Sequence, residues 1–576
     1  MNGTVAAGNT RVDSVSPRRW WTWVIVFSIV FSLIAGLGMR APAPPDEPRF
    51  VLAARTMVES GQWLLPHRGI ELYAEKPPVF MWMQAGAYSL IRNWNVAFLL
   101  PSLLAALATL WMTYRIGAML WSRRIGRYAA LALFATLQFG LMAKRAQIDM
   151  VLLAMMTASL WGLLAHLWRG PNLTALLLGA FAAGLGTVTK GVGFLPLLLF
   201  VPWLTLRFKG KVHAVPASSL QWFLIPLGFA LGLSVWLLPL GIALAAPHGA
   251  ELDIYARELL YQQTATRYAG AWHHIQPACY YVQVMLTLWL PGCLLLPWIL
   301  PAWARRISRG DSRYWLLLGW AALVLVFFSA SPGKREVYIL PALPALCVAA
   351  APLLEGLLRQ RYARWTLTAF PALIAMAALI VVASIMGNAD WLQSRLAGRD
   401  LTPEVLQSLT HWLLFIGVAM LLLVAAFGTR RPAMLTVLSV AVLWTSYGFG
   451  LLPALDASAS SRQVMQQVHS IIGTRGELGL VDWREQNYLQ VGSSVPADFG
   501  FKQPSDVQWH HARKWVEGAP GRRWILVTDK AIGRCVNRAR SISVGSANRN
   551  NWVLVPSVAL VPGCREEISW AENDEQ

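Results

Sequence analysis

The sequence predicts a polytopic α-helical membrane protein with about 13 transmembrane helices and a small C-terminal α/β domain. Of its 576 residues, 56% are hydrophobic and only 14% are charged, and the mean hydropathy is +0.46. A soluble domain usually carries about 25% charged residues, so most of this chain is expected to lie in lipid. After residue 455 the long apolar runs stop and the charge density rises, which marks a second domain.

Apolar runs of about 20 residues define the predicted spans. They lie at 20–39, 94–119, 128–143, 150–168, 173–188, 191–206, 220–246, 278–303, 314–330, 337–358, 365–386, 408–428 and 433–454. The first run follows two arginines, as a secretory signal does, but its apolar core is longer than the ~7–15 residues of a signal peptide. We interpret it as a retained anchor, with residues 1–19 in the cytoplasm and residues 20–455 as the transmembrane domain.

The net charge of +20 would suggest nucleic-acid binding in a soluble protein. With the N-terminus inside, however, the cytoplasmic ends of the predicted spans carry nineteen Lys and Arg residues against three acids. This asymmetry is the positive-inside rule of membrane topology. The basic balance therefore reports orientation, the expected partners are membrane lipids, and no nucleic-acid partner is expected. An odd number of spans places residues 456–576 on the exported side.

Three exported loops are too long to be simple turns, at 40–93, 247–277 and 387–406. In the first loop, apolar residues recur at helical spacing between residues 50 and 58, and a proline pair at 77–78 opens a second apolar segment. Proline suits the first turn of a helix. These patterns predict two short amphipathic helices that lie in the membrane interface.

The C-terminal domain alternates helical and strand patterns. Residues 460–473 and 508–518 predict helices, whereas 477–483, 522–530 and 551–560 predict strands. Cys535 and Cys564 both lie in this exported domain, where disulfides persist. We predict that these two cysteines form a bridge.

Short exported segments should be poor in Lys and Arg, yet this chain carries many charges there. Charge at membrane depth costs about 2.5–3.5 kcal/mol per residue on insertion scales, so each such residue is expected to have a partner or a function. The charged residues in question include Asp46, Glu47, Arg49, Glu75, Lys76, Asp149, Lys190, Arg257, Arg267 and Lys334. A cation-rich cavity on the exported side suits a lipid-linked phosphate.

Each of these groups also has a purely structural interpretation. Asp46 can cap a helix and pair with Arg49 at i+3. Asp149 can pair with Arg145 to anchor a helix end, and Lys190 can snorkel. The remaining candidates can be solvated pairs, loop residues or interface aromatics: Glu75, Lys76, His274 and Tyr338. The gathering of so much charge on one side of the membrane favours the functional interpretation.

Short motifs occur along the chain in a characteristic order. They are D-E at 46–47 before an amphipathic helix, S-G-x-W at 60–63, E-K-P-P at 75–78, R-x-x-x-D at 145–149, T-K-G at 189–191, H-x-x-P at 274–277 and Y-I-L-P at 338–341. Together they resemble the 4-amino-4-deoxy-L-arabinose transferases that modify bacterial lipid A. These are GT-C glycosyltransferases related to protein O-mannosyltransferases. The likeness covers about residues 20–455, and the family's architecture of thirteen spans plus an exported domain matches the prediction.

The resemblance implies transfer of 4-amino-4-deoxy-L-arabinose from undecaprenyl phosphate to a lipid A phosphate at the periplasmic face of the bacterial inner membrane. This modification gives resistance to polymyxin and other cationic peptides. The family's catalytic acids fall on Asp46 and Asp149, and Glu75 is a third candidate. Pre-placed cations stabilise a leaving phosphate in a water-poor site, and we assign this role to Lys76, Arg49, Arg267 or Arg257, and Lys334, with Tyr338 in support. Further candidates are Glu47, Lys190 and His274.

The role of Asp46 depends on the acceptor. A phosphate monoester has a second pKa near ~6 and is already nucleophilic at neutral pH, so Asp46 need not act as a base. It can bind the ammonium of the aminosugar, orient the acceptor, or hold a divalent metal ion with Glu75 and His274. Asp149 is a further possible ligand of such an ion. No compact metal-binding motif is present, so no cofactor is expected to be required, and a divalent metal ion stays an alternative. Direct displacement, with inversion at the anomeric carbon, is the expected course.

Two other functions compete with this one. The first is a GT-C transferase that uses another polyprenyl-phosphate sugar and a protein or polysaccharide acceptor. The second is a lipid or sugar transporter, which commonly has repeated halves and broken helices at the membrane centre. The sequence shows no convincing repeat, and its unusual charges lie towards one face.

Overall fold

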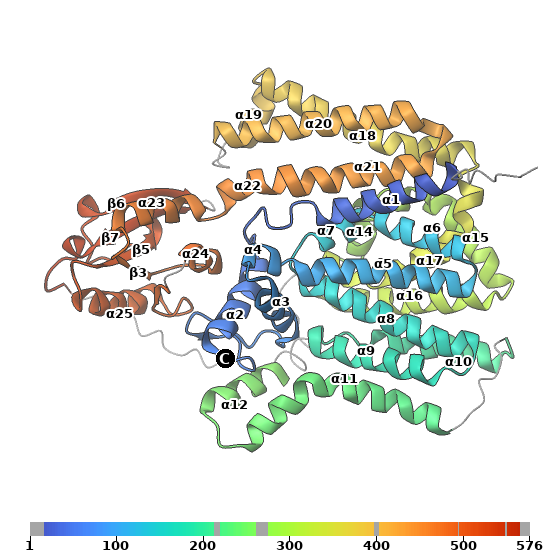
Figure 1. The fold of residues 1–576 in the computed structure, drawn as a ribbon, viewed down its shortest axis with the longest axis horizontal. Coiled ribbons are helices and arrows are strands. Elements are labelled where there is room, and N and C mark those ends of the chain that lie inside the picture. The colour runs from blue at the N-terminus through green and yellow to red at the C-terminus, as the bar shows by residue number, and fades with distance from the viewer. Residues whose placement is uncertain are drawn as a thin grey trace, which may run out of the picture.

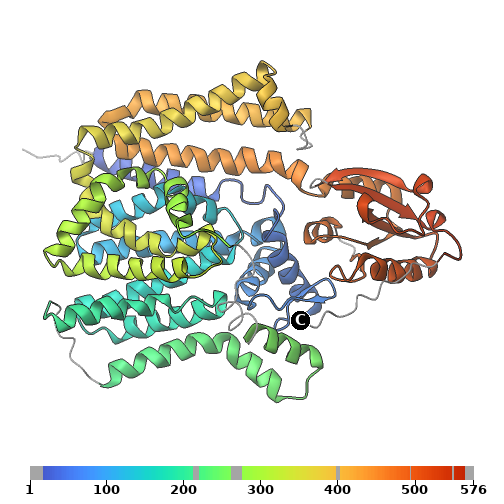
Figure 2. The same ribbon diagram turned by 180° about the vertical axis from the view of Figure 1, so that it is seen from behind.

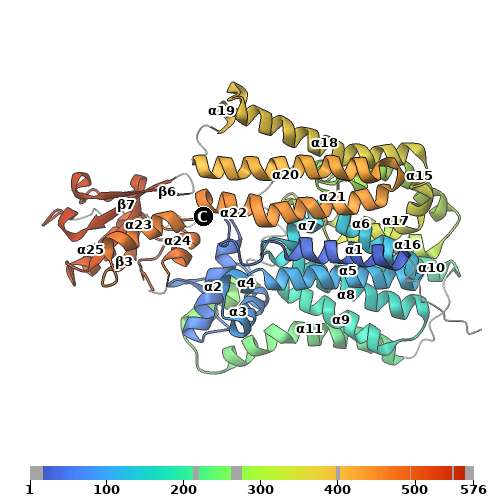
Figure 3. The ribbon, with the colours of Figure 1, turned by 45° about the horizontal axis from the view of Figure 1, so that its top comes forward.

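The computed structural model describes residues 17–211, 219–260, 275–396, 402–492, 495–547 and 550–564. A large bundle of roughly parallel helices carries a smaller α/β domain at one end (Figure 1). The view from behind and the tilted view show the same two-part arrangement (Figure 2 and Figure 3). We call the end of the bundle next to the α/β domain the domain end.

Among the described residues, eight helical segments are long and apolar enough to cross a membrane. They are formed by α4 (Trp94–Ala97) with α5 (Leu100–Leu120), α8 (Ile148–Arg169), α9 (Leu173–Lys190), α11 (Ser219–Ala245), α16 (Ser312–Ala330), α18 (Arg361–Met386), α20 (Pro403–Phe427) with η5 (Gly428–Arg430), and α21 (Pro432–Ser446) continued by η6 (Tyr447–Leu451) and α22 (Leu452–Ala459). A polytopic helical membrane protein is therefore confirmed.

Two further predicted spans are bent pairs. Helices α6 (Arg123–Ala135) and α7 (Leu137–Ala143) meet at 73°, and α14 (Tyr280–Leu288) meets η3 (Gly292–Leu295) and α15 (Leu296–Ser308) at 103°. Shorter apolar helices occupy the other predicted positions: α1 (Pro17–Ile34), η1 (Leu195–Leu199) with α10 (Phe200–Phe208), and α17 (Ala342–Leu357). The count of thirteen crossings stays a prediction.

The breaks in the two bent spans bond to each other. The Leu137 N–H donates to the carbonyl of Leu290 at 3.0 Å, and the Trp289 Nε1–H donates to Gln138 Oε1 at 2.7 Å. Gln138 then donates through Nε2 to the carbonyl of Glu336 at 2.6 Å. Irregular backbone within a membrane protein needs partners inside the protein. These bonds also fix the start of η4 (Glu336–Ile339) at the domain end.

The first long loop contains α2 (Glu47–Ser60), a small hairpin of β1 (His67–Arg68) and β2 (Glu71–Leu72), and α3 (Val79–Ile91). The two predicted helices are present, but the hairpin between them was not predicted. The apolar side of α2 packs against protein rather than lipid, and its residues 52–54 are fully buried. Phe50, Ala53, Ala54 and Met57 pack into the core of the helical bundle, and Leu52 packs into the core of the C-terminal domain. The position of α2 in the membrane interface stays a prediction.

The C-terminal domain contains a five-stranded mixed sheet in the order β4-β3-β5-β7-β6. Its strands are β3 (Glu477–Leu480), β4 (Ala497–Asp498), β5 (Arg523–Thr528), β6 (Ile542–Ala547) and β7 (Asn550–Pro556). Side chains alternate between faces along a strand, so Leu526 packs on the side of α23 (Arg462–Ile472), whereas Ile525 packs on the side of α25 (Ser505–Glu517). Three strands and both helices match the predicted elements; β4, β6 and α24 (Glu485–Gln490) are additional.

Cys535 and Cys564 form a disulfide in the C-terminal domain, with their Cα atoms 5.6 Å apart. Cys279, Cys293 and Cys347 are free thiols. A maleimide should therefore label three thiols of the denatured chain before reduction and five after it, as measured by intact-mass spectrometry. Substitution of Cys279 by serine should lower both counts by one. Labelling of all five thiols without reductant would contradict the bridge.

Candidate active site

The N-termini of α2 and α8 meet at the domain end. Asp46 is the residue before α2, and Asp149 lies in the first turn of α8. Gln147 Nε2 donates to Asp46 Oδ2 at 3.3 Å, and the Ala146 N–H donates to Glu47 Oε1 at 2.8 Å. Helix N-termini carry partial positive charge that stabilises carboxylates. The two helices therefore hold three acids close together beside the bundle.

Glu47 is the buried anchor of this arrangement. Its carboxylate pairs with both terminal nitrogens of Arg40, at 2.7 Å for Nη2, and accepts the Ala43 N–H at 2.7 Å. Arg40 also donates to the carbonyl of Lys144 at 2.9 Å, and both members of the ion pair have side chains that are only 4% exposed. Because all of these bonds are internal, Glu47 acts in the scaffold, although the sequence made it a candidate for the site.

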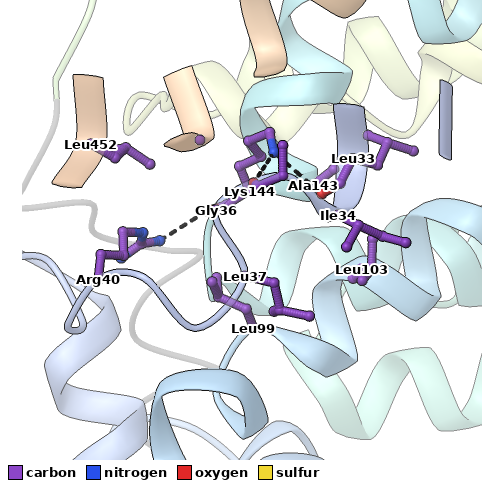
Figure 4. Close-up of a pocket in the computed structure, with 12 residues that line it drawn as sticks. Leu33, Ile34, Gly36, Leu37, Arg40, Leu99, Leu103, Ala143, Lys144 and Leu452 are labelled. Carbon is purple, nitrogen blue, oxygen red and sulfur yellow. Dashed lines mark hydrogen bonds between the residues drawn. The ribbon is translucent and has the colours of Figure 1, made fainter. Parts of the chain in front are cut away.

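Lys144 lies beside this ion pair and caps the C-terminal end of α1. Its ammonium donates to the carbonyls of Ala35 at 2.6 Å and Leu33 at 3.3 Å, which are the groups that a helix C-terminus leaves unbonded. Figure 4 shows Arg40 and Lys144 around a small pocket whose other walls are aliphatic residues and glycines. Both cations already have protein partners, so this pocket is part of the scaffold behind Asp46.

Asp46 is paired with Arg335, at 3.0 Å between Oδ2 and Nη2. The two side chains are 19% and 30% exposed, so the pair remains open to solvent or ligand. Burial opposes the charge on Arg335, but the hydrogen bond and charge of Asp46, with Asp149 and Glu336 nearby, raise its pKa. The expected i+3 pair of Asp46 with Arg49 is therefore wrong, and Asp46 makes no side-chain capping bond.

Asp149 forms a second ion pair, with Lys190 at the C-terminal end of α9. The Lys190 ammonium also lies 5.2 Å from the centre of the Tyr338 ring. The structural interpretations of a pair with Arg145 and of a snorkelling lysine are therefore both wrong. Gln147, which donates to Asp46, lies only two residues before Asp149, so the Asp46–Arg335 and Asp149–Lys190 pairs are neighbours. We call these four residues the paired-charge site.

The E-K-P-P segment follows the small hairpin of the first long loop. Arg68 Nη2 donates to Glu75 Oε1 at 3.2 Å, and Lys76 follows as a partly buried residue. Burial raises the pKa of the Tyr73 phenol most, and the charge of Glu75 raises it further. The charge of Asp46 also raises this pKa, whereas that of Arg49 lowers it. Tyr73 therefore stays protonated. It lies within electrostatic reach of both Glu75 and Asp46.

Two other described candidates, Lys334 and Arg257, take no part in these pairs. Lys334 is buried and donates to the carbonyl of Gln276 at 3.2 Å. Arg257 is exposed at the end of α12 (Ala250–Arg257), while Arg267 and His274 lie outside the described residues. Within the described part of the chain, no three His, Cys, Asp or Glu side chains gather closely enough to hold a metal ion.

Arg335 is the main site residue that the sequence candidates lacked. The sequence favoured its neighbour Lys334, which an α-helical spacing of four residues would place on the same face as Tyr338. The backbone of Arg335 is instead extended, with φ −126° and ψ 152°, and η4 is a 3₁₀ helix. This change of register turns Arg335 towards Asp46. The signal available in the sequence was a lone arginine next to lysine in an exported segment.

Comparisons with known proteins agree with this fold. A family model described as dolichyl-phosphate-mannose-protein mannosyltransferase matches residues 75–238. An undecaprenyl phosphate-α-4-amino-4-deoxy-L-arabinose arabinosyl transferase from Edwardsiella ictaluri is 30% identical over 352 residues, which are 59% of this chain and 60% of that protein. The chain is thus matched over less than two thirds of that relative's length.

Two crystal structures of ArnT from Cupriavidus metallidurans share the fold. The apo structure has a TM-score of 0.70 at 18% identity and covers 95% of this chain and all of its own. The structure bound to undecaprenyl phosphate has a TM-score of 0.67 at 19% identity and covers 94% of this chain and 98% of its own. The chain is therefore a multi-pass membrane protein with the GT-C glycosyltransferase fold. Within that class its sequence is similar to those of aminoarabinose transferases, as its motifs indicated.

Adjacent acids with different environments should respond differently to the same substitution. Glu47→Ala leaves a buried Arg40 without its partner and should cost about 3–5 kcal/mol of stability. Asp46→Ala removes a partly exposed pair and should cost at most about 1 kcal/mol. The thermal unfolding midpoint of the purified chain measures both. Equal shifts for the two variants would contradict the division between scaffold and site.

Proposed function

We propose that this chain transfers 4-amino-4-deoxy-L-arabinose from undecaprenyl phosphate to a phosphate of lipid A. The reaction takes place at the periplasmic face of the inner membrane, and it lowers the negative charge of lipid A and so gives resistance to polymyxin and other cationic peptides. The names of the homologous proteins support the donor. The paired-charge site is the observation from this chain that supports the reaction best.

The donor head group and the site have complementary charges. An undecaprenyl phosphate linked to an aminosugar carries a negative phosphate and a positive ammonium, one sugar ring apart. The site presents the same two charges with opposite signs, as Asp46 and Arg335 in one pair and Asp149 and Lys190 in another. Charges in a poorly hydrated site need partners. Until the donor binds, the acid and the cation of each pair are partners to each other.

Donor binding then exchanges the partners. Arg335 leaves Asp46 for the carrier phosphate, because a guanidinium binds phosphate oxygens in a bidentate manner. Asp46 takes the ammonium of the sugar in its place. Lys76, on the neighbouring E-K-P-P segment, adds a second positive charge at the phosphate. No charge becomes unpaired during this exchange, so the energetic cost of opening the ion pair is offset by the new contacts.

The chemical step is a displacement at the anomeric carbon. A lipid A phosphate oxygen attacks this carbon, the bond to the carrier phosphate oxygen breaks, and the electron pair leaves with undecaprenyl phosphate. The acceptor is largely deprotonated at neutral pH because its second pKa is near ~6, so no base is needed. Negative charge grows on the leaving phosphate, where Arg335 and Lys76 stabilise it. Attack opposite the leaving group inverts the anomeric centre.

The proposal predicts the lipid A produced by living cells. Polymyxin-sensitive cells that make the donor lipid but lack their own transferase should gain the mass of aminoarabinose on lipid A when they express the parent chain. Asp46→Asn and Arg335→Gln should reduce this product about 100-fold or more, because each removes a charge that the transition state needs. Mass spectrometry of extracted lipid A measures the product.

A matched control is Arg359→Gln, which changes an arginine that is 79% exposed and pairs only with Glu355 at the surface. This variant should modify lipid A as the parent does. Unmodified lipid A in cells with confirmed expression of the parent and confirmed donor would refute the proposed acceptor. Parent-like modification by Arg335→Gln would instead refute the partner exchange.

A further inference from the structure

We propose that Glu485, in the C-terminal domain, is a positioning residue for the transfer site, and that the domain controls the site through this carboxylate. The inference rests on the proposed function and adds a role for the domain. Glu485 is the first residue of α24, and its side chain is only 8% exposed. A carboxylate so deeply buried needs charged partners, and it has two, both from the first long loop.

Arg68 is the stronger partner of Glu485. Its Nη1 lies 2.7 Å from Glu485 Oε1, while its Nη2 reaches Glu75 Oε1 at 3.2 Å. The guanidinium is also held between two rings, 4.5 Å from the centre of Tyr73 and 5.0 Å from that of Phe501. Planar stacking and two carboxylates leave Arg68 a single orientation. It therefore transmits the position of Glu485 directly to Glu75.

Arg49 is the second partner, with Nε 3.5 Å from the same Glu485 oxygen. Arg49 lies in the first turn of α2, three residues after Asp46. One buried carboxylate thus holds two cations that would otherwise be attracted to the acids of the site. Without the charge on Glu485, Arg68 would draw closer to Glu75, and Arg49 would lose the anion that keeps it apart from Asp46.

The rest of the contact shows that the domain is docked firmly enough to act in this way. In the turn of the hairpin, the Ile70 N–H donates a hydrogen bond to Asp498 Oδ2 at 3.0 Å. The preceding Gly69 has φ +66°, and a Cβ there would lie 2.0 Å from the same oxygen. Leu52 of α2 is fully buried in the hydrophobic core of the domain. A loop that carries site residues is thus held by hydrogen bonds, ion pairs and apolar packing.

The test measures transfer by the purified full-length chain in lipid nanodiscs, with undecaprenyl phosphate-linked aminoarabinose and lipid A. Glu485→Gln keeps the size of the side chain and loses its charge. It should lower kcat about tenfold or more, as misplacement of catalytic groups does, with little change in the KM for lipid A. Glu485→Asp keeps the charge and should recover part of the loss. The matched control, Glu517→Gln, changes an exposed glutamate of the same domain and should behave as the parent.

Coupling to Glu75 separates positioning from general stability. In a Glu75→Gln background, the additional effect of Glu485→Gln on kcat should fall to about twofold or less, because the two act through one arginine. An equal effect in both backgrounds, or a parent-like kcat for Glu485→Gln, overturns the inference. Failure of the parent to transfer the sugar would refute the proposed function instead.

A second variant covers the case in which Glu485→Gln folds poorly. Arg68→Lys keeps a positive charge at the contact but cannot bond two carboxylates in the fixed geometry of a guanidinium. It should lower kcat to a similar extent as Glu485→Gln. A parent-like kcat for Arg68→Lys would also overturn the inference.

Discussion

The buried ion pair between Arg40 and Glu47 is the interaction on which the site depends. Two charges with side chains only 4% exposed are stable together because further N–H donors and carbonyl acceptors complete their hydrogen bonds. The pair joins the start of the first long loop to the segment before α8. Since Asp46 immediately precedes Glu47, this clamp also fixes Asp46 beside α8. One acid of the D-E motif thus secures the position in which the other acts.

The broken spans supply the opposite half of the site. The 73° bend between α6 and α7 precedes Gln138, which bonds the backbone of η4. That bond fixes the segment that carries Arg335. Asp46 and Arg335 therefore come from two separately held pieces of irregular chain. Such pieces are where a membrane bundle can present polar groups to a ligand, and the C-terminal domain holds the remaining edge.

The hydrophobic pattern predicted the helical class, the positions of the spans and the start of the C-terminal domain, because each depends on local composition. The ion pairs could not be predicted in the same way. Asp46 and Arg335 are 289 residues apart, and a single sequence contains no record of such a contact. The structural alternatives for Asp46 and Asp149 therefore named only the nearest cations along the chain, Arg49 and Arg145. A 3₁₀ turn at residue 336 also changed the register on which Lys334 had been preferred.

The affinity of the chain for undecaprenyl phosphate tests the partner exchange most directly. If the carrier phosphate takes Arg335 from Asp46, the carboxylate competes with the ligand. Asp46→Asn should then bind undecaprenyl phosphate as tightly as the parent or more tightly, whereas Arg335→Gln should bind it about tenfold more weakly, as expected for the loss of a charged hydrogen bond. Equal weakening by both substitutions would show that the pair does not open for the phosphate, and would contradict the account.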